Sequence, residues 1–298
     1  MIVLEVAHIS KSYGPVKALD GFSLQIESGQ VYGILGPNGS GKTTLLGIIS
    51  GILSPDNGQY RWFEGEYILP NLRIGTLLET PNFYPYLNAD DNLDIVRQIK
   101  GVAPMSFDEL LDMVKLTDRR RSVFRTYSLG MKQRLAIAGT LVGDPDVLIF
   151  DEPTNGLDPE GIAEVRSILT DIAATGKTVI MASHILNEVE KVCSHVAIIK
   201  KGNLLANGPV GMILGNADIF ELRADDMGAL RSWCGEQDYI HELHEKHEWL
   251  ELEVDPEIAT ETMIRSISQR GILLTHIVRK KRSLEDEFLE ITNKHENQ

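Results

Sequence analysis

A glycine-rich stretch at residues 36–43 has the residue types and the spacing of a phosphate-binding loop. It follows an apolar run, Val31–Leu35, and precedes a helix that we expect over Lys42–Ile49. With the threonine that follows it, the stretch reads Gly36, Pro37, Asn38, Gly39, Ser40, Gly41, Lys42, Thr43 and Thr44. The glycines let the backbone curl so that its N–H groups point at phosphate oxygens, and the helix adds its positive end. This phosphate loop predicts a nucleotide site in which Lys42 reaches the β/γ-phosphates and the Thr43 hydroxyl ligates Mg²⁺.

Two adjacent carboxylates follow an apolar strand that we expect at residues 147–150. Asp151 is suited to hold Mg²⁺ through its waters, because that cation prefers hard oxygen ligands and keeps much of its hydration. Glu152 is suited to orient or deprotonate an attacking water. Acids after a buried strand also commonly begin a surface loop, but the phosphate loop in the same chain favours the catalytic interpretation. His184 follows another apolar run, at residues 178–181, where its imidazole can hydrogen-bond a γ-phosphate.

Strands and helices that alternate over residues 1–209 predict an α/β domain with a largely parallel sheet. The apolar runs at residues 147–150, 178–181 and 196–199 are expected to be central strands, buried on both faces. A mainly helical subdomain is expected at about residues 85–145. Beyond residue 209 the pattern predicts a small α/β accessory domain, residues 210–298. Its expected strands lie at 219–223, 249–254 and 272–278, and its expected helices at 258–270 and 283–291.

Composition narrows the functional class. The formal net charge of −14 argues against broad nucleic-acid binding, which depends on Lys and Arg. Residues 210–298 carry 19 acidic and 10 basic residues, so most of the excess belongs to the accessory domain. No run approaches the ~20 apolar residues of a spanning helix, and the first residues lack a signal-peptide pattern. Cys193 and Cys234 show no paired spacing, and we expect both to be reduced thiols.

Two weaker patterns lie in the accessory domain. His241, His244 and His247 have a spacing that would suggest a metal site on a helix, but a charged turn or hairpin rim is the favoured interpretation. The basic run at residues 279–282 could contact anionic lipid or a partner, and a solvated loop before the last helix is the favoured interpretation.

A third motif, Ser128-Leu129-Gly130-Met131-Lys132-Gln133, precedes the acidic strand and resembles the signature motif of ABC ATPases. The resemblance covers about residues 1–209. It implies a P-loop NTPase (ABC ATPase) domain with a helical subdomain. Tyr13 then matches the aromatic residue that stacks on adenine, Asp151 and Glu152 the Walker B pair, and His184 the switch histidine. The resemblance implies that Ser128 and Gly130 begin a helix whose positive end faces the γ-phosphate held by a second subunit.

Two positions depart from the family pattern. Leu129 stands at a glycine position of the signature, and Glu79 stands where a glutamine normally contacts Mg²⁺ and links hydrolysis to the membrane subunit. Both departures, with residues 80–84, resemble the branch that contains bacitracin- and lantibiotic-type exporters, and the C-terminal end resembles ABC-2-type export ATPases. The departures do not by themselves indicate an inactive site, because the chain has all four of Lys42, Asp151, Glu152 and His184.

The resemblance implies an ATP-binding and hydrolysing subunit of an ABC transporter. ATP and Mg²⁺ are the expected cofactors. The expected partners are a separate membrane-spanning permease and a second ABC ATPase, identical or similar to this chain, with no nucleic acid. The expected location is the cytoplasmic face of the cell membrane. Two alternatives remain: a soluble ABC ATPase acting in translation or DNA repair, and a regulatory module that binds ATP without hydrolysing it. Soluble ABC ATPases of translation and DNA repair carry two ATPase domains or a long coiled-coil insertion, and neither pattern occurs in this sequence.

Overall fold

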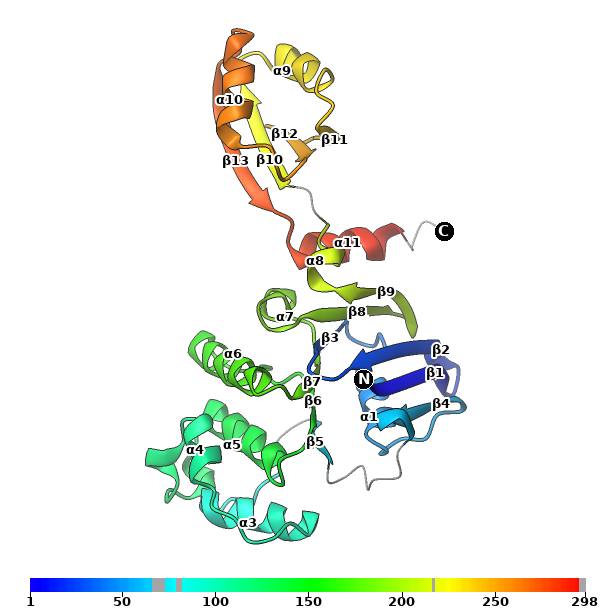
Figure 1. Cartoon of the computed structure of the whole chain (residues 1–298), viewed down its shortest axis with the longest axis vertical. Helices are drawn as coiled ribbons and strands as arrows, with labels where there is room; N and C mark the ends of the chain where they lie inside the picture. Colours follow the sequence, from blue (N-terminus) through cyan, green and yellow to red (C-terminus); the bar gives the residue numbers. More distant parts are fainter. Residues whose placement is uncertain (66–72, 79–81, 216–217, 295–298) are drawn as a thin grey trace. The chain divides into compact units, whose positions relative to one another are not determined.

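The computed structural model describes residues 1–65, 73–78, 82–215 and 218–294, and it divides the chain into two compact units, Met1–Val210 and Gly211–Gln298. Each unit is described by itself (Figure 1). In the described residues, no helix combines the length and the apolar character that crossing a membrane requires.

A six-stranded sheet forms the centre of the first unit, in the order β5-β6-β7-β3-β8-β9. All neighbours are parallel except β8 and β9, which form an antiparallel pair. The strands are β3 (Val31–Leu35), β5 (Ile74–Leu77), β6 (Val147–Asp151), β7 (Thr178–Ser183), β8 (His195–Lys200) and β9 (Asn203–Pro209). Every residue of β3, β6 and β7 is buried, which explains their unbroken apolar runs and confirms the predicted central strands.

A second sheet of the first unit is antiparallel, in the order β2-β1-β4. Its strands are β1 (Ile2–Tyr13), β2 (Val16–Glu27) and β4 (Asn57–Trp62). Helix α1 (Lys42–Ile49) begins where the sequence predicts it, and its apolar residues join a core shared by both sheets. Short 3₁₀ turns occur at Phe63–Gly65, Thr117–Arg119 and Phe124–Thr126.

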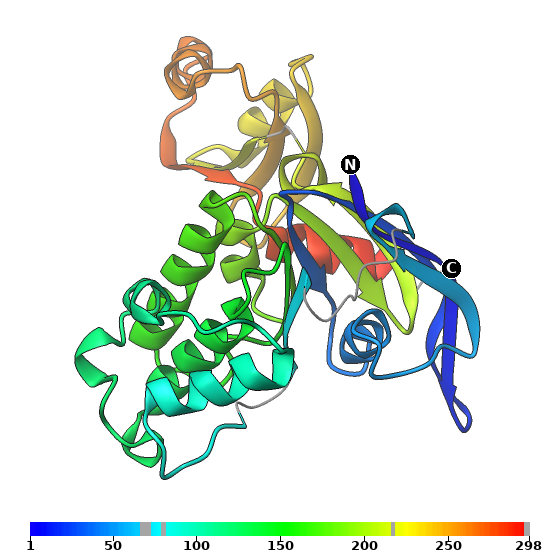
Figure 2. The ribbon, with the colours of Figure 1, turned by 60° about the horizontal axis from the view of Figure 1, so that its bottom comes forward.

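The described residues of the first unit contain five further helices. They are α3 (Ala89–Lys100), α4 (Asp108–Met113), α5 (Leu129–Leu141), α6 (Pro159–Ala174) and α7 (Leu186–Val192). The side chain of Asn88 caps α3, and Gly101 ends it in a left-handed conformation. Figures 1 and 2 show α5 and α6 on one side of the central sheet and α1 on the other. The loop before α1 and the start of α5 therefore belong to opposite faces of the same sheet.

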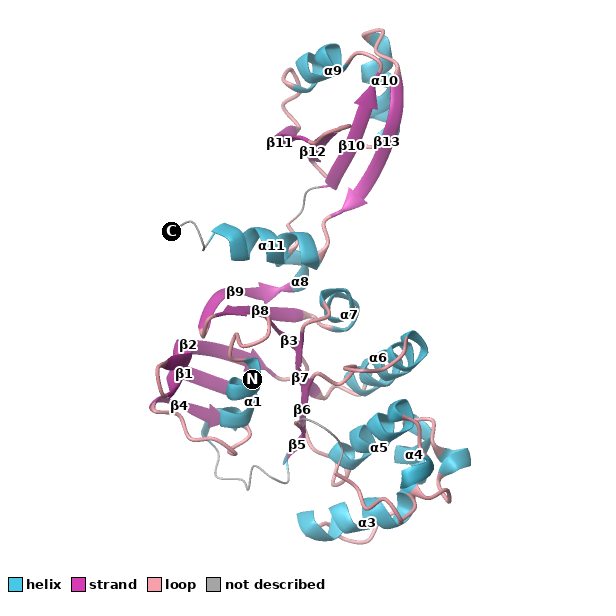
Figure 3. Ribbon diagram, turned by 180° about the vertical axis from the view of Figure 1, so that it is seen from behind, coloured by secondary structure: helices cyan, strands magenta, loops and turns pink. Residues whose placement is uncertain are grey.

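The second unit has the βαββαβ order of a ferredoxin-like split fold (Figure 3). After the short helix α8 (Val210–Ile213), its sheet runs β11-β12-β10-β13. The elements are β10 (Asp218–Ala224), α9 (Met227–Cys234), β11 (Ile240–Glu245), β12 (Leu250–Val254), α10 (Thr260–Gln269), β13 (Leu274–Lys281) and α11 (Leu284–Lys294). Alternate residues of β10 and β12 pack with α9 and α10 in one apolar core.

The basic run of the second unit was wrongly expected to be a solvated loop. Arg279 and Lys280 belong to β13, next to β10. Arg279 hydrogen-bonds Asp218, and the Lys280 ammonium lies 2.6 Å from Glu221 Oε1. Asp218 and Glu221 are buried, so the basic side chains neutralise carboxylates that the fold withdraws from water. This pairing makes the run part of a sheet.

The three histidines at positions 241, 244 and 247 lie at a β-hairpin, which agrees with the favoured interpretation. His241 and His244 belong to β11, and His247 lies in the connection to β12. His241 Nε2 is 2.7 Å from Asp255, and His244 Nε2 is 3.1 Å from Glu242. No group of three or more metal-ligating side chains suited to an ion occurs among the described residues.

Candidate functional site

The phosphate loop connects the end of β3 to the start of α1, and two of its glycines are required by its packing. A Cβ at Gly36 would lie 2.3 Å from the carbonyl oxygen of Ile199. Gly41 has φ 112°, and a Cβ there would lie 2.3 Å from the carbonyl oxygen of Ala18. The loop is therefore pressed against neighbouring backbone and has no room for side chains at these positions.

The side chain of Lys42 turns back across the loop. It is 6% exposed, and its ammonium donates to the carbonyl oxygens of Gly36 at 2.8 Å and Pro37 at 3.3 Å. Pro37, Asn38 and Gly39 are exposed, whereas Ser40 is buried. Thr43 is exposed and Thr44 is half-buried in the first turn of α1. The loop thus presents backbone and hydroxyl groups to solvent around one buried cation.

Glu152 joins Lys42 to His184. Its Oε1 lies 3.7 Å from the Lys42 ammonium, and its Oε2 lies 2.7 Å from Nδ1 of His184. The backbone N–H of His184 also donates to Oε2, at 3.3 Å. Glu152 has a positive φ of 49°, a conformation that costs a non-glycine residue about 1–3 kcal/mol. Lys42, Glu152 and His184 follow β3, β6 and β7, whose carboxyl ends meet at one edge of the sheet.

Asp151, the last residue of β6, is 7% exposed. It is a carboxylate at the same sheet edge as Glu152, and Thr43 supplies a hydroxyl at the start of α1. Both offer the hard oxygen atoms that suit Mg²⁺. The third residue that we expected near the metal, Glu79, lies outside the described residues.

The signature residues begin α5, as predicted. The Ser128 hydroxyl accepts a hydrogen bond from the N–H of Met131 at 3.2 Å, which caps the helix. A Cβ at Gly130 would meet nothing nearer than Cα of Gly161, at 4.0 Å. Leu129 is 48% exposed, and its Cδ2 lies 3.4 Å from a Cβ built at Gly156. The helix end is therefore open to an approaching anion, with Leu129 packed beside it.

Tyr13, expected at the adenine, lies on the antiparallel sheet at the end of β1. It is 49% exposed, and the Lys11 ammonium lies 5.9 Å from its ring centroid. Asp56 fixes this corner, because it accepts hydrogen bonds from Lys11 Nζ at 2.9 Å and the N–H of Ser12 at 2.7 Å. Both bonds lower the pKa of the Asp56 carboxyl below its usual value, and the bond from Lys11 has the larger effect on that pKa.

The two cysteines are free and buried, as expected of reduced thiols. Burial raises the pKa of each thiol to about 12, so neither is a reactive thiolate near neutral pH. Cys193 lies under the start of β3, where its sulfur is 3.2 Å from a Cβ built at Gly33. Both thiols serve packing.

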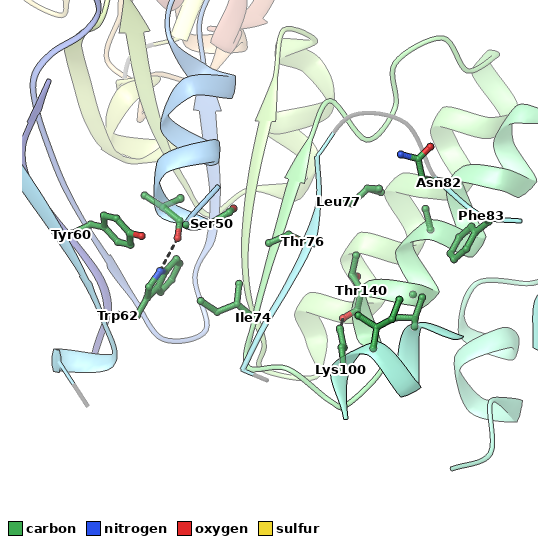
Figure 4. A pocket seen from close by; sticks show the side chains of 16 residues that line it. Ser50, Tyr60, Trp62, Ile74, Thr76, Leu77, Asn82, Phe83, Lys100 and Thr140 are labelled. Carbon is green, nitrogen blue, oxygen red and sulfur yellow. Dashed lines mark hydrogen bonds between the residues drawn. The ribbon is translucent and has the colours of Figure 1, made fainter. Parts of the chain in front are cut away.

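Sequence reasoning did not predict a groove of about 580 Å³ in the first unit. One wall contains Tyr60 and Trp62 of β4 with the end of α1, and the other contains Lys100 of α3 with Thr140 of α5 (Figure 4). Ile99 of α3 also lines the groove. Because these residues come from segments far apart in the chain, no local spacing indicated the groove.

Comparisons with known proteins agree with this geometry. The sequence model described as ABC transporter matches residues 19–155. The bacitracin transport ATP-binding protein BcrA of Bacillus licheniformis is 34% identical over 298 residues, 97% of this chain and 97% of its own. The lantibiotic transport ATP-binding protein SrtF of Streptococcus pyogenes is 39% identical over 204 residues, 68% of this chain and 89% of its own.

Two solved structures show the same fold over most of the first unit's length. An ATP-binding cassette of an ABC transporter in its ADP conformation has a TM-score of 0.64 and 26% identity, covering 70% of this chain and 91% of its own. A dimeric cassette in a post-hydrolysis state, bound to ADP and Pi, has a TM-score of 0.62 and 25% identity, covering 70% and 99%. The chain belongs to the ATP-binding proteins of ABC transporters and is an ATPase whose hydrolysis of ATP is coupled to transport.

Proposed function

We propose that ATP is hydrolysed at the sheet edge where Lys42, Glu152 and His184 meet. The observation that carries this proposal is their continuous line of contacts, 3.7 Å from Lys42 to Glu152 and 2.7 Å from Glu152 to His184. The N–H groups of the phosphate loop and the Lys42 ammonium bind the phosphates, and the exposed Tyr13 ring stacks on adenine. Glu152 accepts the proton of the attacking water, and His184 orients Glu152 and hydrogen-bonds the γ-phosphate.

Thr43 and Asp151 are the residues that would hold Mg²⁺, and the donor set of one hydroxyl and one buried carboxylate fits that hard cation. When bound, Mg²⁺ neutralises charge on the phosphate oxygens. Glu79 is a candidate third oxygen donor at this metal. Orientation of the water and transfer of its proton remain the work of Glu152 and His184.

The open end of α5 supports a two-copy site. Ser128 is exposed, Gly130 leaves space, and α5 lies on the opposite face of the sheet from α1. In our proposal, Ser128 and Gly130 of one copy contact the γ-phosphate bound by the phosphate loop of a second copy, or of a similar chain. ATP then joins the two subunits, and its hydrolysis separates them. The dimeric cassette with bound ADP and Pi supports this arrangement.

The groove supports a membrane partner. Its apolar and aromatic lining is open, and Ile99 at its rim is 80% exposed. An exposed apolar patch of this kind marks a surface for another protein. We assign it to a segment of a separate membrane-spanning permease, which places the chain at the cytoplasmic face of the membrane. Because two transport ATPases for peptide antibiotics are among its relatives, export of such a compound is the proposed direction and cargo class.

The second unit is proposed to be an accessory domain that supports the dimer or regulates it. Its fold is closed by its own apolar core, so it does not depend on the nucleotide site for stability. The unit carries most of the acidic excess of the chain, which favours a solvated surface.

ATP hydrolysis by the purified full-length chain, measured alone and in proteoliposomes with the permease that co-purifies with it, tests the proposal. We expect hydrolysis that the permease stimulates. An activity that needs no membrane protein and is stimulated by ribosomes or DNA instead would support the soluble alternative. Tight ATP binding without any turnover would support the regulatory module.

A further inference from the structure

Lys100 connects the groove to the signature helix. It is the last residue of α3, and its ammonium donates to the carbonyl oxygens of Thr140 at 3.0 Å and Val142 at 2.8 Å. Val142 is the C-cap of α5, and α5 has no basic residue in its own last turn. Lys100 therefore supplies from another helix the positive charge that stabilises the negative end of α5.

This cation lies in an otherwise uncharged part of the groove. Tyr60 and Lys100 are the titratable residues among those that line it within the described residues. On α3 itself, Arg97 is engaged elsewhere, because it pairs with Asp94 at 2.6 Å and donates to the carbonyl oxygen of Val102 at 2.7 Å. Figure 4 shows Lys100 beside Thr140, on the wall opposite Tyr60 and Trp62. A segment that fills the groove therefore contacts the Lys100 side chain.

Lys100 is half-buried, and withdrawing an ammonium even partly from water is unfavourable. Burial lowers the pKa of Lys100 to about 8, from an ordinary value of 10.5. A methionine or leucine would fill the same space without this cost. A lysine that lines a cleft with so altered a pKa is a candidate for a functional role.

We propose that Lys100 is the positioning residue through which a permease segment seated in the groove acts on α5, and so on the Ser128 end that faces the second nucleotide. The inference rests on the proposed docking of a permease in this groove. A helix of 13 residues is a rigid rod of about 20 Å, so a displacement imposed at Val142 reaches Ser128. Covering Lys100 also strengthens its bonds to Thr140 and Val142, because water no longer competes for them.

The test is the ratio of permease-stimulated to permease-free ATP hydrolysis, measured from pH 6.5 to 9.5 in proteoliposomes with the co-purifying permease. We expect Lys100→Met, which keeps the apolar stem, to lower the ratio at pH 7 by at least about tenfold, because the variant loses two charge-assisted hydrogen bonds and one such bond corresponds to about that factor. The wild-type ratio should fall as pH passes through about 8, where Lys100 loses its proton. Lys100→Arg should keep its ratio above pH 8, because a guanidinium stays protonated there.

Lys177→Met is the matched control. Lys177 also donates to a carbonyl just after α5, that of Pro145, at 2.8 Å, but it does not line the groove. We expect its ratio and its pH profile to equal those of the wild type. If Lys100→Met binds the permease and keeps the wild-type ratio and profile, the inference is wrong while the proposed function stands. If the wild-type chain neither binds nor responds to the permease, the proposed docking itself is wrong.

Discussion

Oε2 of Glu152 lies 2.7 Å from Nδ1 of His184, and the same carboxylate reaches toward the Lys42 ammonium with its other oxygen. Lys42 lies 110 positions before Glu152 and His184 lies 32 positions after it, yet both contact the Glu152 carboxylate. The parallel strands β3, β6 and β7 bring them together, because adjacent parallel strands end at the same edge of the sheet. The strained backbone of Glu152 holds its side chain between the other two.

Glu152→Gln should bind ATP but hydrolyse it 10²–10⁴-fold more slowly, the usual contribution of a general base. An amide has the shape of the carboxylate but cannot take a proton from water. The variant should accumulate as a dimer with MgATP, and size-exclusion chromatography with light scattering would show it. Hydrolysis by this variant at the wild-type rate would exclude Glu152 as the base.

His184→Ala should separate hydrolysis from binding. Removing the imidazole frees Oε2 of Glu152 to rotate toward Lys42, so the carboxylate no longer points at the attacking water. We expect kcat to fall by about 10²-fold while the ATP dissociation constant changes less than about threefold. Steady-state kinetics and calorimetric titration measure the two effects. Equal losses in both would make His184 a binding residue.

Lys42→Ala should abolish tight binding of ATP. The variant loses the lysine of the phosphate loop, and the carbonyl oxygens of Gly36, which is buried, and Pro37, which is exposed, lose the ammonium that bonds them. A charge-assisted hydrogen bond contributes about 1.5–3 kcal/mol, so the dissociation constant should rise by about 10-fold to 10²-fold. Lys191→Ala, a change on the exposed side of α7, is the control and should bind ATP normally. Comparable losses in both variants would argue against a specific role for Lys42.

Gly41→Ala should distort the phosphate loop. Its backbone has φ 112°, and the added Cβ would lie 2.3 Å from the Ala18 carbonyl, which belongs to backbone and cannot move aside cheaply. Gly39→Ala is the matched control, because Gly39 also has a positive φ but no atom lies within 4 Å of a built Cβ. Gly39→Ala should cost about 1 kcal/mol of unfolding free energy, and Gly41→Ala clearly more. Urea denaturation of both variants measures the difference.

The parts of the structure that were predicted correctly are those whose cause is local. Residues 147–150 and 178–181 are apolar throughout because β6 and β7 are buried on both faces. The start of α5 was expected from the resemblance of residues 128–133 to a signature motif, and the structure shows that the Ser128 side chain caps the helix there by bonding Met131. The phosphate loop is likewise a local motif of eight consecutive residues, and the structure places it between β3 and α1 as expected.

The parts that were missed depend on contacts between distant segments. Lys280 is in a strand because β13 pairs with β10, and its side chain bonds Glu221, 59 positions away; no local pattern shows this pairing. Strand β11 is polar along much of its length and lacks the alternation that marks a strand. Helix α9 has only eight residues and was not predicted from the sequence. The groove around Lys100 is assembled from separate segments and had no sequence signal.

The altered pKa of Lys100 should also make the unfolding free energy depend on pH. In the folded chain this pKa is about 8, and in the unfolded chain it returns to the ordinary 10.5. Between these values the unfolded state binds more protons than the folded state, so the unfolding free energy rises with pH. Below pH 8 Lys100 is charged in the folded chain, and its desolvation lowers the unfolding free energy by the full amount. This penalty decreases between about pH 8 and 10.5, where the folded chain holds Lys100 uncharged.

Lys100→Met lacks this group, whereas its other titrating groups match those of the wild type. The unfolding free energy of the wild type minus that of Lys100→Met should therefore increase from pH 7 to pH 9.5. Because the ammonium is partly exposed, solvent screening makes this increase smaller than it would be for a fully buried group. Denaturation midpoints of both proteins at several pH values measure this difference, and Lys177→Met supplies the control with an unchanged Lys100. A difference that stays constant, or that shifts in favour of Lys100→Met as pH rises, would mean that Lys100 is not buried as a cation in the folded chain.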